Sequence, residues 1–154
     1  MERLLIVAAI ALVAVVVAAV VQRRQPPSTP AETGYHVPAQ LHRPDFDRPG
    51  AEWLVVVFTS ATCATCAGMW EKARQLESDA VAVAEVEVTA RRDLHDRYGI
   101  DGVPTTVVAD AEGVVRASFL GPATATDVWA AVAELRAPGS VPEACDTHIV
   151  PPDT

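Results

Sequence analysis

Two cysteines separated by two residues, Cys63 and Cys66, are the residues in this sequence best suited to chemistry. The spacing places two thiols about one helical turn apart, where they can form a disulfide or bind a metal together. Ala67 follows the second cysteine, which excludes the Cys-x-x-Cys-His pattern of haem attachment. One such pair is only half of a structural zinc site, and three cysteines in 154 residues are too few for a disulfide-stapled scaffold. The pair therefore favours thiol–disulfide exchange.

The elements on either side of this pair are predicted to be a buried strand and a helix. Residues 53–59 form a short apolar run rich in branched side chains, which is typical of a strand buried on both faces. Residues 64–78 carry apolar side chains near helical spacing, with charged residues between them, and predict a helix. The cysteines would then lie at a helix N-terminus, where unpaired N–H groups favour a thiolate.

The rest of the domain alternates between predicted strands and helices. We expect a strand at 81–88, a short helix at 91–98 ended by Gly99, a strand–turn–strand hairpin at 105–120, and a last helix capped by Thr124 or Thr126 and running to Arg136. This order predicts an α/β fold, a mixed sheet of four to five strands with helices on both sides.

The segment before the domain divides into an apolar helix and a proline-rich linker. Leu4 to Val21 is an uninterrupted run of Ala, Val, Ile and Leu, and eighteen helical residues span about 27 Å, enough for one transmembrane helix. A cleaved signal peptide is the alternative, but Arg23 and Arg24 directly after the run are typical of a retained anchor. We therefore expect an anchor at 1–24 in a cell membrane, crossed once, with the arginine flanks weakly favouring a cytoplasmic domain.

Residues 25–36 are expected to be a proline-rich linker, 37–136 the folded domain and 137–154 an irregular tail. Within the domain, 37–46 is expected to supply a first edge strand and turn.

The formal net charge is −8, and residues 25–154 hold nine basic and nineteen acidic residues. A domain this acidic is repelled by phosphate backbones, which argues against nucleic-acid binding.

The order of elements, the Cys-x-x-Cys after the first long strand and the run Gly102-Val103-Pro104-Thr105 together resemble the thioredoxin family, over roughly residues 37–136. The chain looks most like a membrane-anchored, thioredoxin-like protein of bacterial type. This resemblance implies a thioredoxin fold in which Pro104 follows a cis peptide bond and faces the cysteines. It also reveals departures: Val57 stands where the family keeps a buried aspartate thought to move protons, Thr62 replaces a tryptophan, and Glu71 replaces a helix-kinking proline.

For such a protein we expect Cys63 to attack a disulfide, with a pKa below that of a free cysteine, and Cys66 to resolve the mixed disulfide. Thr62, Val103 and Pro104 are expected to bind an extended substrate peptide. Protein thiols and disulfides would be the partners, with no metal and no organic cofactor. The direction of electron flow stays open between reductase, oxidase and isomerase, and the sequence predicts no oligomeric state.

A non-catalytic thioredoxin-like module that binds a partner, or a soft metal such as copper, through the same cysteines is the alternative function. Cys145 in the tail is either an incidental free thiol or a residue that forms a mixed disulfide, pairs between chains or reaches the active site. The histidines are scattered without ligand spacing, at positions His36, His42, His95 and His148.

Overall fold

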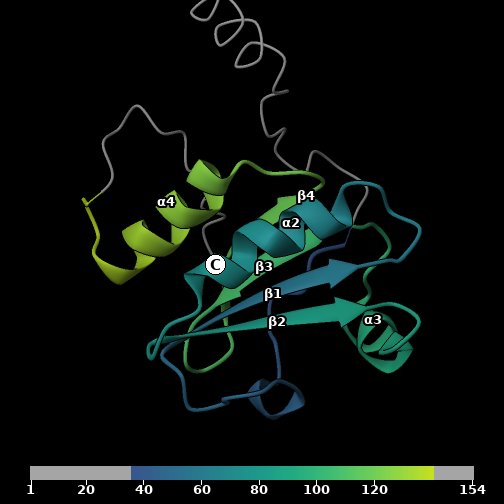
Figure 1. The fold of residues 1–154 in the computed structure, drawn as a ribbon. Helices are drawn as coiled ribbons and strands as arrows, with labels where there is room; N and C mark the ends of the chain where they lie inside the picture. The colour runs from purple at the N-terminus through teal and green to yellow at the C-terminus, as the bar shows by residue number, and fades with distance from the viewer. Residues whose placement is uncertain (1–35, 141–154) are drawn as a thin grey trace, which may run out of the picture.

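The structure is a computed structural model that describes residues 36–140 (Figure 1). The predicted anchor, most of the linker and most of the tail lie outside these residues. In chain order the elements are η1 (Arg43–Asp45), β1 (Trp53–Thr59), α2 (Cys66–Ala73), η2 (Arg74–Leu76), β2 (Val81–Glu87), α3 (Arg92–Tyr98), β3 (Thr105–Ala109), β4 (Val115–Leu120) and α4 (Ala125–Arg136). Among the described helices none is long and apolar enough to span a membrane.

The four strands form one mixed sheet in the order β2-β1-β3-β4. β1 pairs in parallel with β2 and antiparallel with β3, while β3 and β4 form the predicted antiparallel hairpin. The mixed α/β sheet is confirmed with four strands. The expected edge strand within 37–46 is wrong: that segment makes a single bridge, Gln40 to Val114, and one short 3-10 turn.

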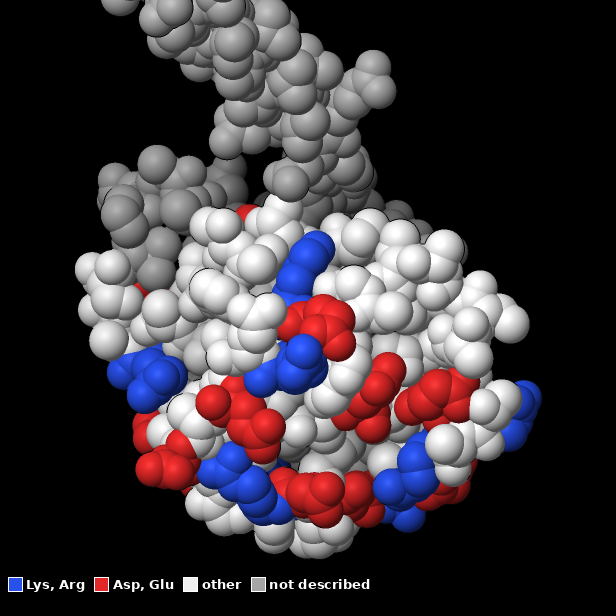
Figure 2. All heavy atoms as spheres, viewed as in Figure 1, with Lys and Arg blue, Asp and Glu red and all other residues white. Residues whose placement is uncertain are grey.

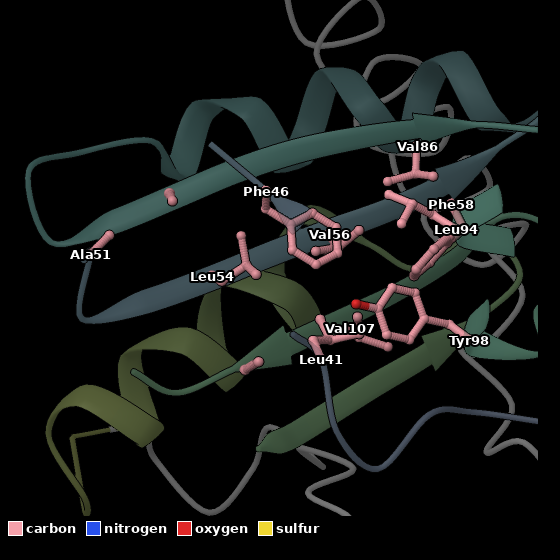
Figure 3. Close-up of a cluster of buried hydrophobic side chains, with 12 residues drawn as sticks. Leu41, Phe46, Ala51, Leu54, Val56, Phe58, Val86, Leu94, Tyr98 and Val107 are labelled. Carbon is pink, nitrogen blue, oxygen red and sulfur yellow. The ribbon is translucent and has the colours of Figure 1, made fainter. Parts of the chain in front are cut away.

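β1 is one of the two inner strands, and side chains cover both of its faces. Leu54, Val56 and Phe58 pack with Leu94 and Tyr98 of α3 in one apolar cluster (Figure 3). The alternate residues of β1 pack on the other face in a second cluster, formed mainly with α2 and α4, that contains Val55, Val57, Met69, Ala73, Val128, Ala131 and Val132. Helices therefore lie on both sides of the sheet, as the order of elements predicts, with α2 and α4 on the same side (Figure 1).

Local sequence signals set where α3 ends and where α4 begins. α4 begins after Thr124, whose hydroxyl accepts a hydrogen bond from the Asp127 amide, and the Asp127 side chain caps in return. α3 ends at Gly99, which has the left-handed conformation with a φ of 63°. α2 is shorter than the predicted helix over 64–78, because the chain before Cys66 follows turns and the chain after Ala73 tightens into a 3-10 turn.

The segment before β1 is held against the β3–β4 turn by close backbone contact. The Leu41 amide donates a 2.8 Å hydrogen bond to the Gly113 carbonyl. Gly113 has a φ of +83°, and a Cβ there would lie 2.1 Å from the Leu41 carbonyl oxygen. Only glycine fits this contact without displacing the segment.

We expect Gly113→Ala to lower the free energy of unfolding by about 2 kcal/mol or more, since the left-handed backbone and the overlap both oppose a side chain. Gly68→Ala in α2 is the opposite control, because a Cβ there meets nothing within 4 Å. It should raise the free energy of unfolding by roughly 0.5 to 1 kcal/mol. Urea unfolding of both variants measures these effects, and equal stabilities would contradict the account.

Candidate active site

The two cysteines lie where β1 ends and α2 begins, and they form a disulfide with Cα atoms 5.5 Å apart. Cys66 is the first residue of α2 and only 2% exposed, whereas Cys63 is partly exposed in the preceding turn. The two sulfur atoms are therefore unequal: a partner arriving from solvent reaches Cys63, while Cys66 is covered by protein.

The turn that carries Cys63 is held by short-range hydrogen bonds. The Cys63 amide donates to the Ser60 carbonyl at 3.0 Å, and the Thr62 amide donates to the Ser60 hydroxyl at 3.3 Å. The Thr65 hydroxyl lies 3.7 Å from Cys63 Sγ. These neighbours are uncharged, so the turn places no side-chain charge of its own beside the exposed sulfur.

The loop before β3 forms the opposite side of the site. The Val103–Pro104 peptide bond is cis, as the resemblance implied. The Val103 carbonyl oxygen lies 3.9 Å from Cys63 Sγ, a contact and not a hydrogen bond because a disulfide sulfur carries no proton. Pro104 is buried and Thr62 is exposed. The fold thus brings Cys63, Cys66 and Val103 together from segments distant in the sequence, with Thr62 beside them.

A small cavity of about 150 Å³ opens beside the disulfide. Its lining residues come from the end of β1, the turn, the start of α2 and the edge strand β2: Thr59, Ser60, Ala61, Cys63, Cys66, Ala67, Glu85 and Glu87. The two glutamates are the residues that the sequence analysis missed. Alternation along 81–88 was the available signal, because positions 85 and 87 share one face of a strand.

Glu87 fixes the turn ahead of the cysteines. Its carboxylate accepts the hydroxyl and amide of Thr89 and the amides of Ala61 and Ala90. These bonds, the Thr89 hydroxyl first, lower the pKa of Glu87 against the opposing effect of burial. Ala61 lies two residues before Cys63 in the turn. Its hydrogen bond to Glu87 therefore links β2 to the turn that carries Cys63.

Glu85 lies two residues before Glu87 on the same face of β2 and lines the same cavity. One of its carboxylate oxygens accepts a 2.9 Å hydrogen bond from the hydroxyl of Thr59, which is buried at the end of β1. In the sheet, Glu85 is level with Val57 of β1, and Val57 is level with Thr106 of β3. Val57 is fully buried, and the buried Thr106 hydroxyl has no hydrogen-bond partner in the structure.

The described histidines lie away from the cysteines. His95 is buried in α3 with its Nε2 2.9 Å from the Val86 carbonyl oxygen, and His36 Nδ1 lies 3.1 Å from the Tyr98 carbonyl oxygen. Within residues 36–140 no three His, Cys, Asp or Glu side chains gather as a metal-binding group. Cys145 and His148 lie outside the described residues.

Comparisons with known proteins agree with this geometry. The family model for thioredoxin matches residues 42–134. Similar solved structures, each with a TM-score of 0.50, include a mutant thioredoxin from Halobacterium salinarum, which is 23% identical over 75% of this chain and 93% of that chain. The germline-specific thioredoxin Deadhead from Drosophila melanogaster is 24% identical over 56% of this chain and 84% of that chain. A chloroplastic thioredoxin z is similar at 22% identity, over 56% of this chain and 80% of that chain. A comparison with curated protein sequences found no match.

We expect Glu87→Gln to destabilise the protein in a pH-dependent way. The folded-state pKa of Glu87 lies below its ordinary value of 4.5, so its ionised form contributes stability that is present above pH 4.5 and is lost as the pH falls through the folded-state pKa. The difference in urea midpoint between wild type and Glu87→Gln should therefore be largest at neutral pH and should disappear in acid.

Glu52→Gln is the control, because it removes the same charge from an exposed residue at the opposite end of β1. A gap between wild type and Glu87→Gln that stays constant down to about pH 2 would contradict the proposed role of the ionised carboxylate.

Proposed function

Because the chain belongs to the thioredoxin family, we propose that it exchanges electrons with protein partners through the Cys63–Cys66 dithiol and disulfide. The family match and the cysteine pair support a thiol–disulfide redox role. The observation that carries the proposal is the unequal exposure of the two cysteines, with Cys63 partly exposed and Cys66 buried beside it. That asymmetry suits one thiol to meet the partner and the other to complete the exchange.

Cys63 is the attacking thiol in this proposal. It lies in the turn that leads into α2, whose first amides carry partial positive charge and stabilise a nearby thiolate. No acidic side chain occupies the first turn of α2 to oppose this effect. The Cys63 thiolate attacks a partner disulfide, forms a mixed disulfide, and one partner sulfur leaves as a thiolate.

Cys66 then resolves the mixed disulfide. Its thiol loses a proton and its sulfur attacks Cys63 Sγ, which forms the Cys63–Cys66 disulfide and releases the second partner thiolate. The partner disulfide gains two electrons and the dithiol loses two. The reverse sequence oxidises a partner, and the compartment's redox poise selects the direction among reductase, oxidase and isomerase.

Val103, Pro104 and Thr62 are proposed to receive the partner peptide. The Val103 carbonyl oxygen lies beside Cys63 Sγ, where an extended segment can pair with exposed backbone groups. The turn that carries Cys63 and the loop residues Val103 and Pro104 bear no charged side chain, whereas Glu85 and Glu87 line the cavity beside the disulfide. Charged side chains of both signs are interspersed on the lower part of Figure 2. Backbone pairing next to an uncharged turn and loop accepts many sequences, which suits exchange with several partners.

We further propose that residues 1–24 tether the domain to a bacterial cell membrane and that 25–36 act as its spacer. The support is the eighteen-residue apolar run followed by Arg23 and Arg24 and then by prolines. The arginine flanks weakly favour a cytoplasmic domain.

The redox proposal predicts that the wild-type protein accelerates insulin reduction by a small dithiol. Cys66→Ser should accumulate a mixed disulfide with partner proteins because the resolving thiol is missing, and Cys63→Ser should accumulate none. Non-reducing gels followed by mass spectrometry measure the trapped species. A wild type that reduces no disulfide, together with a Cys66→Ser variant that traps no partner, would favour the non-catalytic binding module.

The tether predicts that the full chain stays with membranes during alkaline carbonate extraction, while a variant lacking residues 1–24 is released. Intact mass of the membrane-bound protein distinguishes an anchor from a cleaved signal peptide, since cleavage removes the apolar run. Labelling of Cys145 by an impermeant maleimide in intact cells then reports the side of the membrane. Release of the full chain by carbonate would contradict the tether.

A further inference from the structure

The proposed resolving step requires the Cys66 thiol to lose a proton, although Cys66 is only 2% exposed. A buried thiol cannot pass its proton directly to bulk water, and the thiolate is the form that attacks. Val57, on the strand that runs beneath α2, is fully buried, and its side chain has no oxygen to accept the proton. The proton therefore needs another route.

The cavity beside the disulfide supplies that route. Cys66 and Glu85 both line it, and its volume of about 150 Å³ is large enough for several water molecules, each of which needs roughly 30 Å³. Small residues keep it open: Ala61 and Ala67 line it where larger side chains would fill the space. Water in this cavity can connect the Cys66 sulfur to a carboxylate.

The two glutamates of the cavity differ in their capacity to accept a proton. Glu87 already accepts four hydrogen bonds, which lower its pKa and hold it ionised. Glu85 accepts one, from the Thr59 hydroxyl, and the residue is exposed at the edge strand. Its carboxylate is therefore oriented by the protein at one oxygen and open to water at the other.

We propose that Glu85, oriented by Thr59, is the proton-relay residue for Cys66 and accepts the thiol proton through water in the cavity. This inference rests on the proposed thiol–disulfide exchange. In the resolving step the proton passes from Cys66 to the Glu85 carboxylate while the Cys66 sulfur attacks Cys63 Sγ. Glu85 then returns the proton to solvent, where the released partner thiolate takes one up. In the reverse direction Glu85 delivers the proton to Cys66 as the disulfide opens.

The remaining charged groups near Cys66 are engaged elsewhere. The cavity lining contains no lysine, arginine or histidine. On α2, Glu71 pairs with Arg74, and the Lys72 ammonium donates to the Ala123 carbonyl. The cis-peptide loop across from Cys63 contributes Val103 and Pro104, which carry no charge. Glu85 and Glu87 are thus the ionisable groups that share the cavity with the two cysteines.

The test mixes the full-length reduced protein with an aromatic disulfide whose released thiolates absorb visible light. Absorbance then follows the attack by Cys63 and the resolution by Cys66 as two separate steps. The first thiolate appears when Cys63 attacks, and the second appears when Cys66 resolves the adduct. We expect Glu85→Gln to leave the first step within about twofold of wild type and to slow the second about tenfold or more at neutral pH. The deficit should shrink as the pH rises, because hydroxide then removes the Cys66 proton.

Two further variants complete the design. Glu71→Gln removes the same charge from α2 outside the cavity and should leave both steps unchanged. Thr59→Val removes the hydroxyl that orients Glu85 and should slow the second step less than Glu85→Gln does.

Whether Glu85→Gln slows or accelerates the second step distinguishes a proton relay from a purely electrostatic effect of the carboxylate. If Glu85 acted only through its charge, its removal would lower the pKa of the Cys66 thiol and accelerate the second step at neutral pH. Acceleration, or a second step equal to wild type at every pH, overturns the relay and leaves the proposed function intact. Absence of both thiolate releases in the wild type would instead overturn the proposed function itself.

Discussion

The burial of β1 on both faces is the constraint on which the rest of the structure depends. Its backbone is paired with β2 on one side and β3 on the other, and its side chains from Leu54 to Phe58 are fully covered. A strand enclosed in this way accommodates polar groups only with a loss of stability, so the first polar side chain of β1 is Thr59, at its last position. The chemistry of the domain is therefore confined to the end of β1, where the chain leaves the sheet for α2.

Much of the fold could be predicted because local patterns and tertiary structure agree. The apolar run 53–59, the hairpin 105–120 and the end of α3 at Gly99 each carry a signal within a few residues. The errors arise where specific contacts, local or distant, override the periodic pattern. The start of α2 is moved to Cys66 by the Ser60 turn and the disulfide, and residues 37–46 make only one bridge because their position is set by contact with the Gly113 turn. Neither contact is visible from local periodicity.

The candidate site shows the same division. Cys63 and Cys66 are identified by spacing, and Val103 and Pro104 by the resemblance, whereas Glu85 and Glu87 were missed. Alternation places the two glutamates on one face of a strand, but a glutamate on an edge strand usually faces solvent, so the pattern does not reveal which cavity they line. Their significance depends on the parallel register that sets Glu85 level with Val57, and on the small side chains that leave a cavity between β2 and α2. Register and empty volume are properties of the assembled fold.

Placing the carboxyl on β2 instead of β1 changes the balance between stability and proton access. An ionised carboxylate at Val57 would be fully buried, and such a group costs free energy unless it is well paired. The buried Thr106 hydroxyl, level with Val57, has no hydrogen-bond partner among the described residues, so this part of the sheet already holds one buried polar group. At Glu85 the carboxylate stays hydrated and needs only the Thr59 hydroxyl for orientation. β1 keeps its apolar packing, and the distance between the acid and Cys66 is then bridged by water, which makes the cavity itself part of the proton path.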